Sequence, residues 1–79
     1  MKICVLDRGW VAVGNLEKDG SYYLLCNASF IRRWGTTQGL GEIAKDGPTK
    51  DTILDKTPML KFHESHLIFT ISCNEEKWK

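Results

Sequence analysis

Two arginines, an indole, two hydroxyls and an amide stand close together in one short stretch of this 79-residue chain. The residues are Arg32, Arg33, Trp34, Thr36, Thr37 and Gln38. A guanidinium group suits phosphate or carboxylate well, because its planar fork donates two parallel hydrogen bonds. An indole offers a flat face on which a base can stack. The stretch therefore predicts a site for a small phosphorylated or nucleotide-like ligand.

The element that should position this site is a short helix directly after it. Thr36 or Thr37 can act as its N-cap, and Leu40, Ile43 and Ala44 form one apolar stripe at helical spacing. A helix start presents unpaired backbone N–H groups and a partial positive charge, both of which favour an anion. A Gly-Pro pair then ends the helix. Because interior glycines weaken it, we expect packing on a sheet to hold it.

Arg8 and Trp10 offer a further cation and a second stacking face at the start of an expected strand. The same residue types also have a purely structural interpretation. In it, Trp10 and Trp34 pack in a core or a subunit interface. Arg32 and Arg33, as successive strand residues, then point to opposite faces of the sheet and into solvent. The sequence leaves both interpretations open.

Patterns for catalysis or metal binding are missing from the sequence. His63 and His66 flank an expected turn, and Cys4, Cys26 and Cys73 lack the paired spacing of zinc ligands. No acid is paired with a nucleophile or a metal motif, and no phosphate-binding loop motif occurs. We therefore expect a binding protein with no cofactor and no metal, although an unrecognised hydrolase of the same ligand is an alternative.

Composition indicates a single domain over residues 1–79. A chain this short buries only about 60–65% of its unfolded surface, which favours a homo-oligomer. The net charge of +1 argues against nucleic acid and membrane surfaces as partners. The apolar runs are too short for a signal peptide or a membrane span, and the thiols are unpaired, so we expect the cytoplasm.

Most of the remaining chain has strand character. The strand-like runs are residues 3–6, 10–17, 22–26, 30–34, 58–62 and 67–73. Asp19-Gly20 predicts a hairpin between two of them, and Pro58 suits an edge strand. The expected fold is α+β, a small and mostly antiparallel sheet of five or six strands with one short helix packed on it.

Several finer expectations follow from single residues. Gly14 should mark a bulge, and a break or bulge is expected at residues 27–29. We expect residues 49–57 to form an ordered loop and residues 67–73, the most strand-like run, to form a central strand. Near the C-terminus, a capped turn should let Trp78 pack back onto the domain.

The order of these motifs resembles that of small proteins encoded by bacteriophages and prophages, which are filed as domains of unknown function. The resemblance covers most of the chain and is carried by Arg8-Gly9-Trp10-Val11, Arg32-Arg33-Trp34-Gly35-Thr36-Thr37, Gly39-Leu40-Gly41-Glu42-Ile43-Ala44 and Gly47-Pro48-Thr49. It implies an accessory protein that acts on host machinery in the host cytoplasm. One group of such proteins binds host immune nucleotide signals in pockets shared between subunits.

From the residues and the resemblance together, we expect a non-enzymatic phage protein that binds a small nucleotide-like or anionic ligand and sequesters a host immune signal. The rival class is a protein-interaction module that inhibits a host protein through exposed aromatic side chains.

Overall fold

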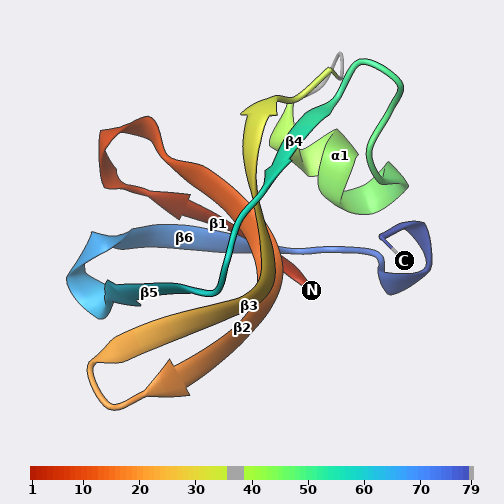
Figure 1. Cartoon of the computed structure of the whole chain (residues 1–79). Coiled ribbons are helices and arrows are strands. Elements are labelled where there is room, and N and C mark those ends of the chain that lie inside the picture. Colours follow the sequence, from red (N-terminus) through yellow and green to blue (C-terminus); the bar gives the residue numbers. More distant parts are fainter. Residues whose placement is uncertain (36–38, 79) are drawn as a thin grey trace.

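A computed structural model describes residues 1–35 and 39–78. Within them the chain forms an antiparallel six-stranded sheet and one α-helix (Figure 1), as the sequence predicts. The strands are β1 (Lys2–Leu6), β2 (Val11–Asp19), β3 (Tyr22–Arg33), β4 (Ile53–Lys56), β5 (Leu60–His63) and β6 (Leu67–Ser72). The helix is α1 (Leu40–Asp46), and the three short 3-10 turns are η1 (Asp7–Gly9), η2 (Glu64–His66) and η3 (Glu75–Lys77).

The strand order is β4-β3-β2-β1-β6, and β5 also pairs with β3. Both β4 and β5 fit beside β3 because β3 is 12 residues long. Its second half pairs with β4 and its first half with β5, so the two short strands follow one another along the same edge. In Figure 1 the sheet is strongly curled, and α1 lies at the end near β4.

The long β2–β3 hairpin bends at Gly14 and Asn27. The pairing register shifts between Val13 and Asn15, and Asn27 has a φ of 52°. A Cβ at Gly14 would lie 2.7 Å from the carbonyl oxygen of Cys26, which explains the glycine at this close approach. The expected bulge is confirmed as a single register shift, with Gly14 of β2 opposite Asn27 and Ala28 of β3. β3 runs through this bulge as one strand, where the sequence indicated two runs.

Side chains fill a core on each face of the sheet, since successive residues of a strand point to opposite faces. The first core lies under α1 and contains Ile3, Val11, Val13, Ile31, Ile43 and Ala44. The second lies on the other face and contains Cys4, Ala12, Leu25 and Ala28. Partly buried side chains of β5 and β6, among them Leu60, Phe62 and Leu67, close this second core.

Helix α1 keeps the predicted apolar stripe but not the predicted cap. Ile43 and Ala44 are buried against the sheet. Gly47, with a φ of 84°, ends the helix by donating its N–H to the Ile43 carbonyl at 2.8 Å. The N-cap position is occupied by Gly39, which has no side chain to cap with, so the expectation of a threonine cap is wrong. The threonines themselves lie outside the described residues.

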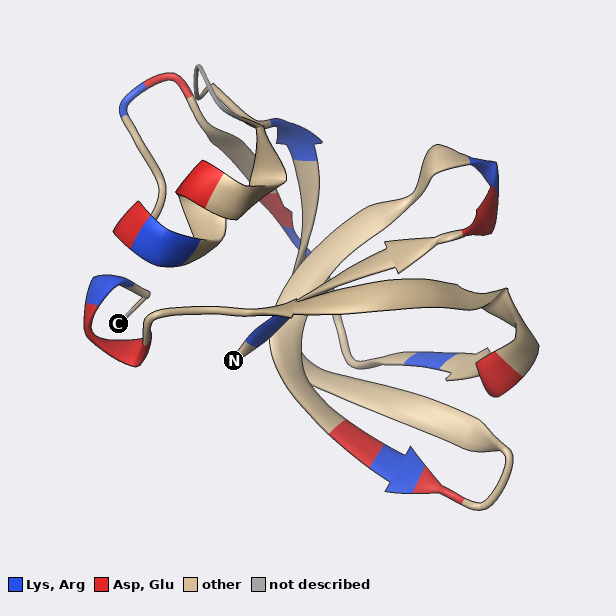
Figure 2. Cartoon of the chain, turned by 180° about the vertical axis from the view of Figure 1, so that it is seen from behind, with Lys and Arg blue, Asp and Glu red and all other residues tan. Residues whose placement is uncertain are grey.

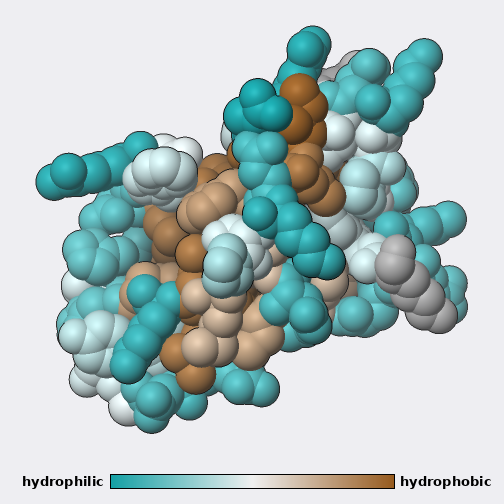
Figure 3. All heavy atoms as spheres, in the orientation of Figure 1, coloured by the Kyte–Doolittle hydropathy of each residue, from teal (hydrophilic) through white to brown (hydrophobic). Residues whose placement is uncertain are grey.

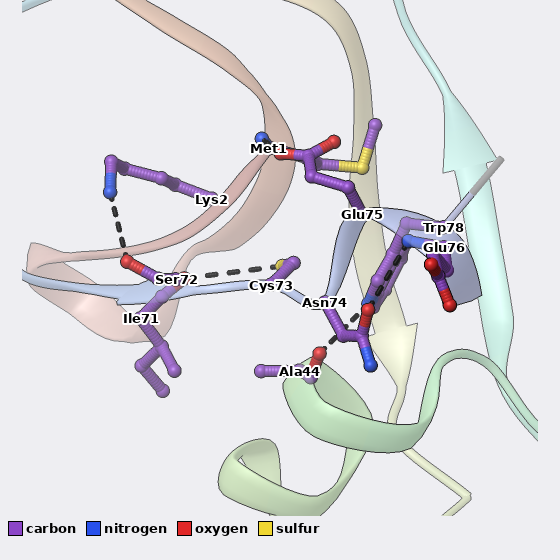
Figure 4. A network of polar contacts seen from close by, with 10 residues as sticks. All are labelled: Met1, Lys2, Ala44, Ile71, Ser72, Cys73, Asn74, Glu75, Glu76 and Trp78. Carbon is purple, nitrogen blue, oxygen red and sulfur yellow. Dashed lines mark hydrogen bonds and ion pairs between the residues drawn. The ribbon is translucent and has the colours of Figure 1, made fainter.

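The C-terminal segment fastens α1 to β1 and β6 (Figure 4). The indole N–H of Trp78 donates to the carbonyl oxygens of Ile43 and Ala44, each at 3.2 Å. The backbone N–H of Asn74 also donates to the Ala44 carbonyl, at 2.9 Å. The N-terminal ammonium of Met1 forms an ion pair with Glu75. The expected return of Trp78 to the domain is confirmed.

Two expectations about strands are wrong. Residues 53–56 form β4 instead of a loop, because pairing with β3 and the partial burial of Ile53 and Leu54 outweigh the polar flanks. Residues 67–73 are not central, since among the described strands β6 pairs only with β1 and lies at the end of the sheet order. Among the described residues, no helix has the length and apolar character needed to cross a membrane.

Candidate functional site

An aromatic pair lies at the centre of the candidate site, formed by the exposed Trp10 and the partly buried Phe30. Trp10 follows the η1 turn, in which Arg8 and Gly9 have left-handed φ angles of 61° and 81°. Its side chain is 57% exposed. The register that pairs Ala12 with Phe30 brings the ring of Phe30 to 5.2 Å from that of Trp10, tilted by 52°. The two rings therefore form a joint aromatic surface, which is open to solvent at Trp10.

Two hollows flank this aromatic pair. The first, the apolar hollow, has a volume of about 170 Å³ and is lined by Leu6, Trp10, Phe30, Leu60, Lys61 and Phe62. The second, the charged hollow, has a volume of about 280 Å³ and is lined by Gly9, Trp10, Val11, Phe30, Ile31, Arg32 and Asp55. In Figure 3, apolar side chains gather in the middle of the visible face, with polar side chains around them. A flat group can therefore contact the rings from either side.

A guanidinium and a carboxylate face each other in the charged hollow. Arg32 Nε lies 2.8 Å from Asp55 Oδ2, and Nη2 donates to Oδ1 at 3.3 Å. Both side chains are about half exposed or more, at 65% and 48%. An ion pair this exposed contributes at most about 1 kcal/mol, so an incoming anion can displace Asp55 from the guanidinium at little cost.

The structure thus unites two of the predicted site residues, Trp10 and Arg32, which are far apart in the sequence. Arg8 and Arg33 are exposed and line neither hollow. Trp34, 41% exposed, lies away from both hollows, with its ring 3.7 Å from the point where a Cβ at Gly39 would stand. Thr36, Thr37 and Gln38 lie outside the described residues, and α1 has only seven residues.

Sequence reasoning missed Phe30, Asp55 and the apolar lining from β5. Phe30 lies two residues before Arg32, so strand periodicity could have placed both on one face beside Trp10. Asp55 could not be found in this way, because the segment that carries it was expected to be a loop. Its pairing opposite Phe30 in β4 is a consequence of the fold.

The two histidines contact neighbouring polar groups, and Cys4 and Cys73 are buried or partly buried. His63 Nδ1 accepts from the backbone N–H of Ser65, and His66 Nδ1 lies 2.8 Å from Asp7 Oδ2. Burial raises the pKa of the Cys4 thiol to about 11 and also raises that of Cys73, which keeps both thiols protonated near neutral pH. In the part of the chain that the structure describes, no three metal-ligating side chains come together.

The chain matches no known protein family and no curated protein.

Proposed function

We propose that this chain is a non-enzymatic binding protein for a small anionic ligand that carries a flat ring, such as a nucleotide. The observation that carries the proposal is the exposed indole of Trp10, which shares one hollow with the guanidinium of Arg32. Exposed tryptophan is costly in contact with water and stacks well on a base. The guanidinium beside it supplies the matching contact for phosphate.

The two hollows suggest how such a ligand would lie. The ring would stack on Trp10 and reach over Phe30 toward the apolar hollow. The phosphate would occupy the charged hollow and accept hydrogen bonds from Nε and Nη2 of Arg32. In the structure these two nitrogens contact the carboxylate of Asp55. Because Asp55 repels an anion, its displacement is part of the binding equilibrium and lowers the affinity.

Binding without cleavage is the simpler function for this arrangement. Asp55 is the carboxylate that lines the charged hollow, and it contacts Arg32 instead of a hydroxyl or imidazole that it could activate. Recovery of the intact ligand after denaturation of the complex tests this part of the proposal. Recovery of a hydrolysed product would favour the alternative of a hydrolase.

For the ligand class, we propose the nucleotide signals of host immunity, with this chain as a phage protein that sequesters them in the host cytoplasm. The support is the resemblance of the sequence motifs to phage-encoded proteins. Cyclic dinucleotides and cyclic ADP-ribose-type molecules are therefore the first ligands to titrate by calorimetry. Saturable binding by the wild type, lost in Arg32→Ala and kept in Arg33→Ala, would support the proposal. No heat with any of these ligands would contradict it.

The apolar hollow favours one second candidate, a protein-interaction surface. Its volume of about 170 Å³ suits a single apolar side chain of a partner, with Trp10 as the aromatic anchor beside it. A host protein retained by the wild type but not by Trp10→Ala, without any nucleotide bound, would favour this candidate.

A further inference from the structure

Among the described strands, none pairs with the outer edge of β6. Just beyond β6, on this same side, the N–H of Asn74 donates to the Ala44 carbonyl of α1 at 2.9 Å, so the open edge ends at Ser72. β6 pairs with β1, while β5, which precedes it in the chain, pairs with β3. The N–H of Cys73 donates to the Met1 carbonyl at 3.0 Å, which marks the side of the strand that faces β1. Backbone groups alternate in direction along a strand, so those of Thr70 and Ser72 point to the open side.

The composition of β6 differs from that of the other edge strands. β4 and β5 are four residues long, and each carries charged or basic side chains, such as Asp55 and Lys61. β6 has six residues and no charge, and Figure 2 shows it without a charged residue along its whole length. Natural sheets protect free edges with shortness and charge, and β6 has neither protection. An uncharged sequence of this length is typical of a strand that pairs with another strand on each edge.

Exposed apolar side chains accompany this edge. Ile68 is 61% exposed and Phe69 is 51% exposed. We propose that β6 pairs with β6 of a second copy of this chain, antiparallel across a two-fold axis, so that the two sheets become one. This proposal does not depend on the ligand proposed above.

The residues of β6 suit such a symmetric pairing. A two-fold axis places the same strand opposite itself, and an uncharged strand brings no like charges together. With the axis at Ile71, Thr70 of each copy faces Ser72 of the other, and these pairs exchange about four backbone hydrogen bonds. The register shift that leaves Ile68 out of the β1 pairing lies outside this stretch. Phe69 then lies opposite Cys73 of the second copy, which is the last position before Asn74 and its hydrogen bond to Ala44 of α1.

Sedimentation equilibrium tests the pairing. We expect the wild type at about 100 µM to show twice the chain mass of 9.0 kDa. Thr70→Pro removes one outward N–H and leaves the hydrogen bonds to β1 in place, so we expect a folded monomer. Thr70→Val keeps the N–H and is the matched control, which should remain dimeric.

A second variant and a second measurement test the pairing even if Thr70→Pro does not fold. Thr70→Lys places two like charges beside the axis and should also give a monomer. In the wild type, hydrogen exchange should protect the amides of Thr70 and Ser72, and dilution should remove that protection. A wild type that stays at 9.0 kDa, or a folded Thr70→Lys variant that still dimerises with those amides protected, would overturn the proposal.

Discussion

Arg32 and Asp55 form a two-point ion pair, with Nε 2.8 Å from Oδ2, although 23 residues separate them in the sequence. The pair lies in a hollow that also contains the indole of Trp10. It therefore holds a guanidinium group beside the exposed indole. Because the two side chains carry opposite charges, replacing one or the other should change the affinity for an anionic ligand in opposite directions.

We predict that Asp55→Asn strengthens the binding of an anionic ligand several-fold. The substitution removes the negative charge that competes for Arg32 and keeps the shape of the side chain. Arg32→Ala should weaken binding by tenfold or more, because about 1.5–3 kcal/mol of charged hydrogen bonding is lost. Calorimetric affinities would show both effects. Weaker binding by Asp55→Asn would mean that the ligand uses the carboxylate, which contradicts an anionic ligand.

The stability of the domain should depend strongly on Trp78. Trp78→Phe removes the indole N–H that donates to Ile43 and Ala44, and should lower the free energy of unfolding by about 1 kcal/mol. Trp78→Ala also removes the packing against α1 and should cost about 3 kcal/mol. Urea unfolding would measure both. As a control, Trp10→Ala should cost much less, since Trp10 is 57% exposed.

Two glycine substitutions should have opposite effects on stability. A Cβ at Gly14 would meet the carbonyl oxygen of Cys26 at 2.7 Å, so we expect Gly14→Ala to destabilise the domain by about 1–3 kcal/mol. A Cβ at Gly41 meets nothing within 4 Å, and Gly41→Ala should stabilise α1 by about 0.5–1 kcal/mol. Thermal unfolding of the two variants, compared with the wild type, would check the contrast. Equal shifts in the same direction would contradict the bulge geometry.

The stability should also fall at alkaline pH because of Cys4. Burial raises the pKa of its thiol from 9.0 to about 11. As pH rises through this window, the unfolded chain releases the proton first, so the free energy of unfolding decreases between pH 9 and 11. Below pH 9 this contribution is constant. Urea unfolding across that window should show a shallower decline for Cys4→Ala, and an identical decline would contradict the assignment.

The fold could be predicted further from the sequence than the site could. Apolar alternation, the hairpin turn at Gly20, the bulge at Gly14 and the return of Trp78 are local or depend on single residues. The identity of the fourth strand could not be predicted, because the pairing of Ile53 and Leu54 with β3 decides it. The edge position of β6 depends likewise on the strand order of the whole sheet, which local propensity does not contain.

The candidate site illustrates the same limit. The sequence predicts both Arg32 and Trp10 as ligand-binding residues, but it places Arg32 in the stretch before the helix and Trp10 beside Arg8 at the start of another strand. Their meeting depends on the register between β2 and β3, which shifts at the bulge between Val13 and Asn15. A shift of one residue would place Arg32 on the other face of the sheet. Sequence patterns identify the chemistry of such residues but not which of them share a hollow.

In the proposed complex, an anionic ring ligand binds between Trp10 and Arg32. Two-dimensional NMR of the labelled protein during titration with a cyclic dinucleotide or a cyclic ADP-ribose-type molecule tests it most directly. We predict that the indole N–H of Trp10 and the Nε–H of Arg32 shift together and saturate, while the indole N–H of Trp78 does not move. Shifts confined to Trp34 and Arg33, or no saturable shift with any of these ligands, would show that no such ligand binds between Trp10 and Arg32.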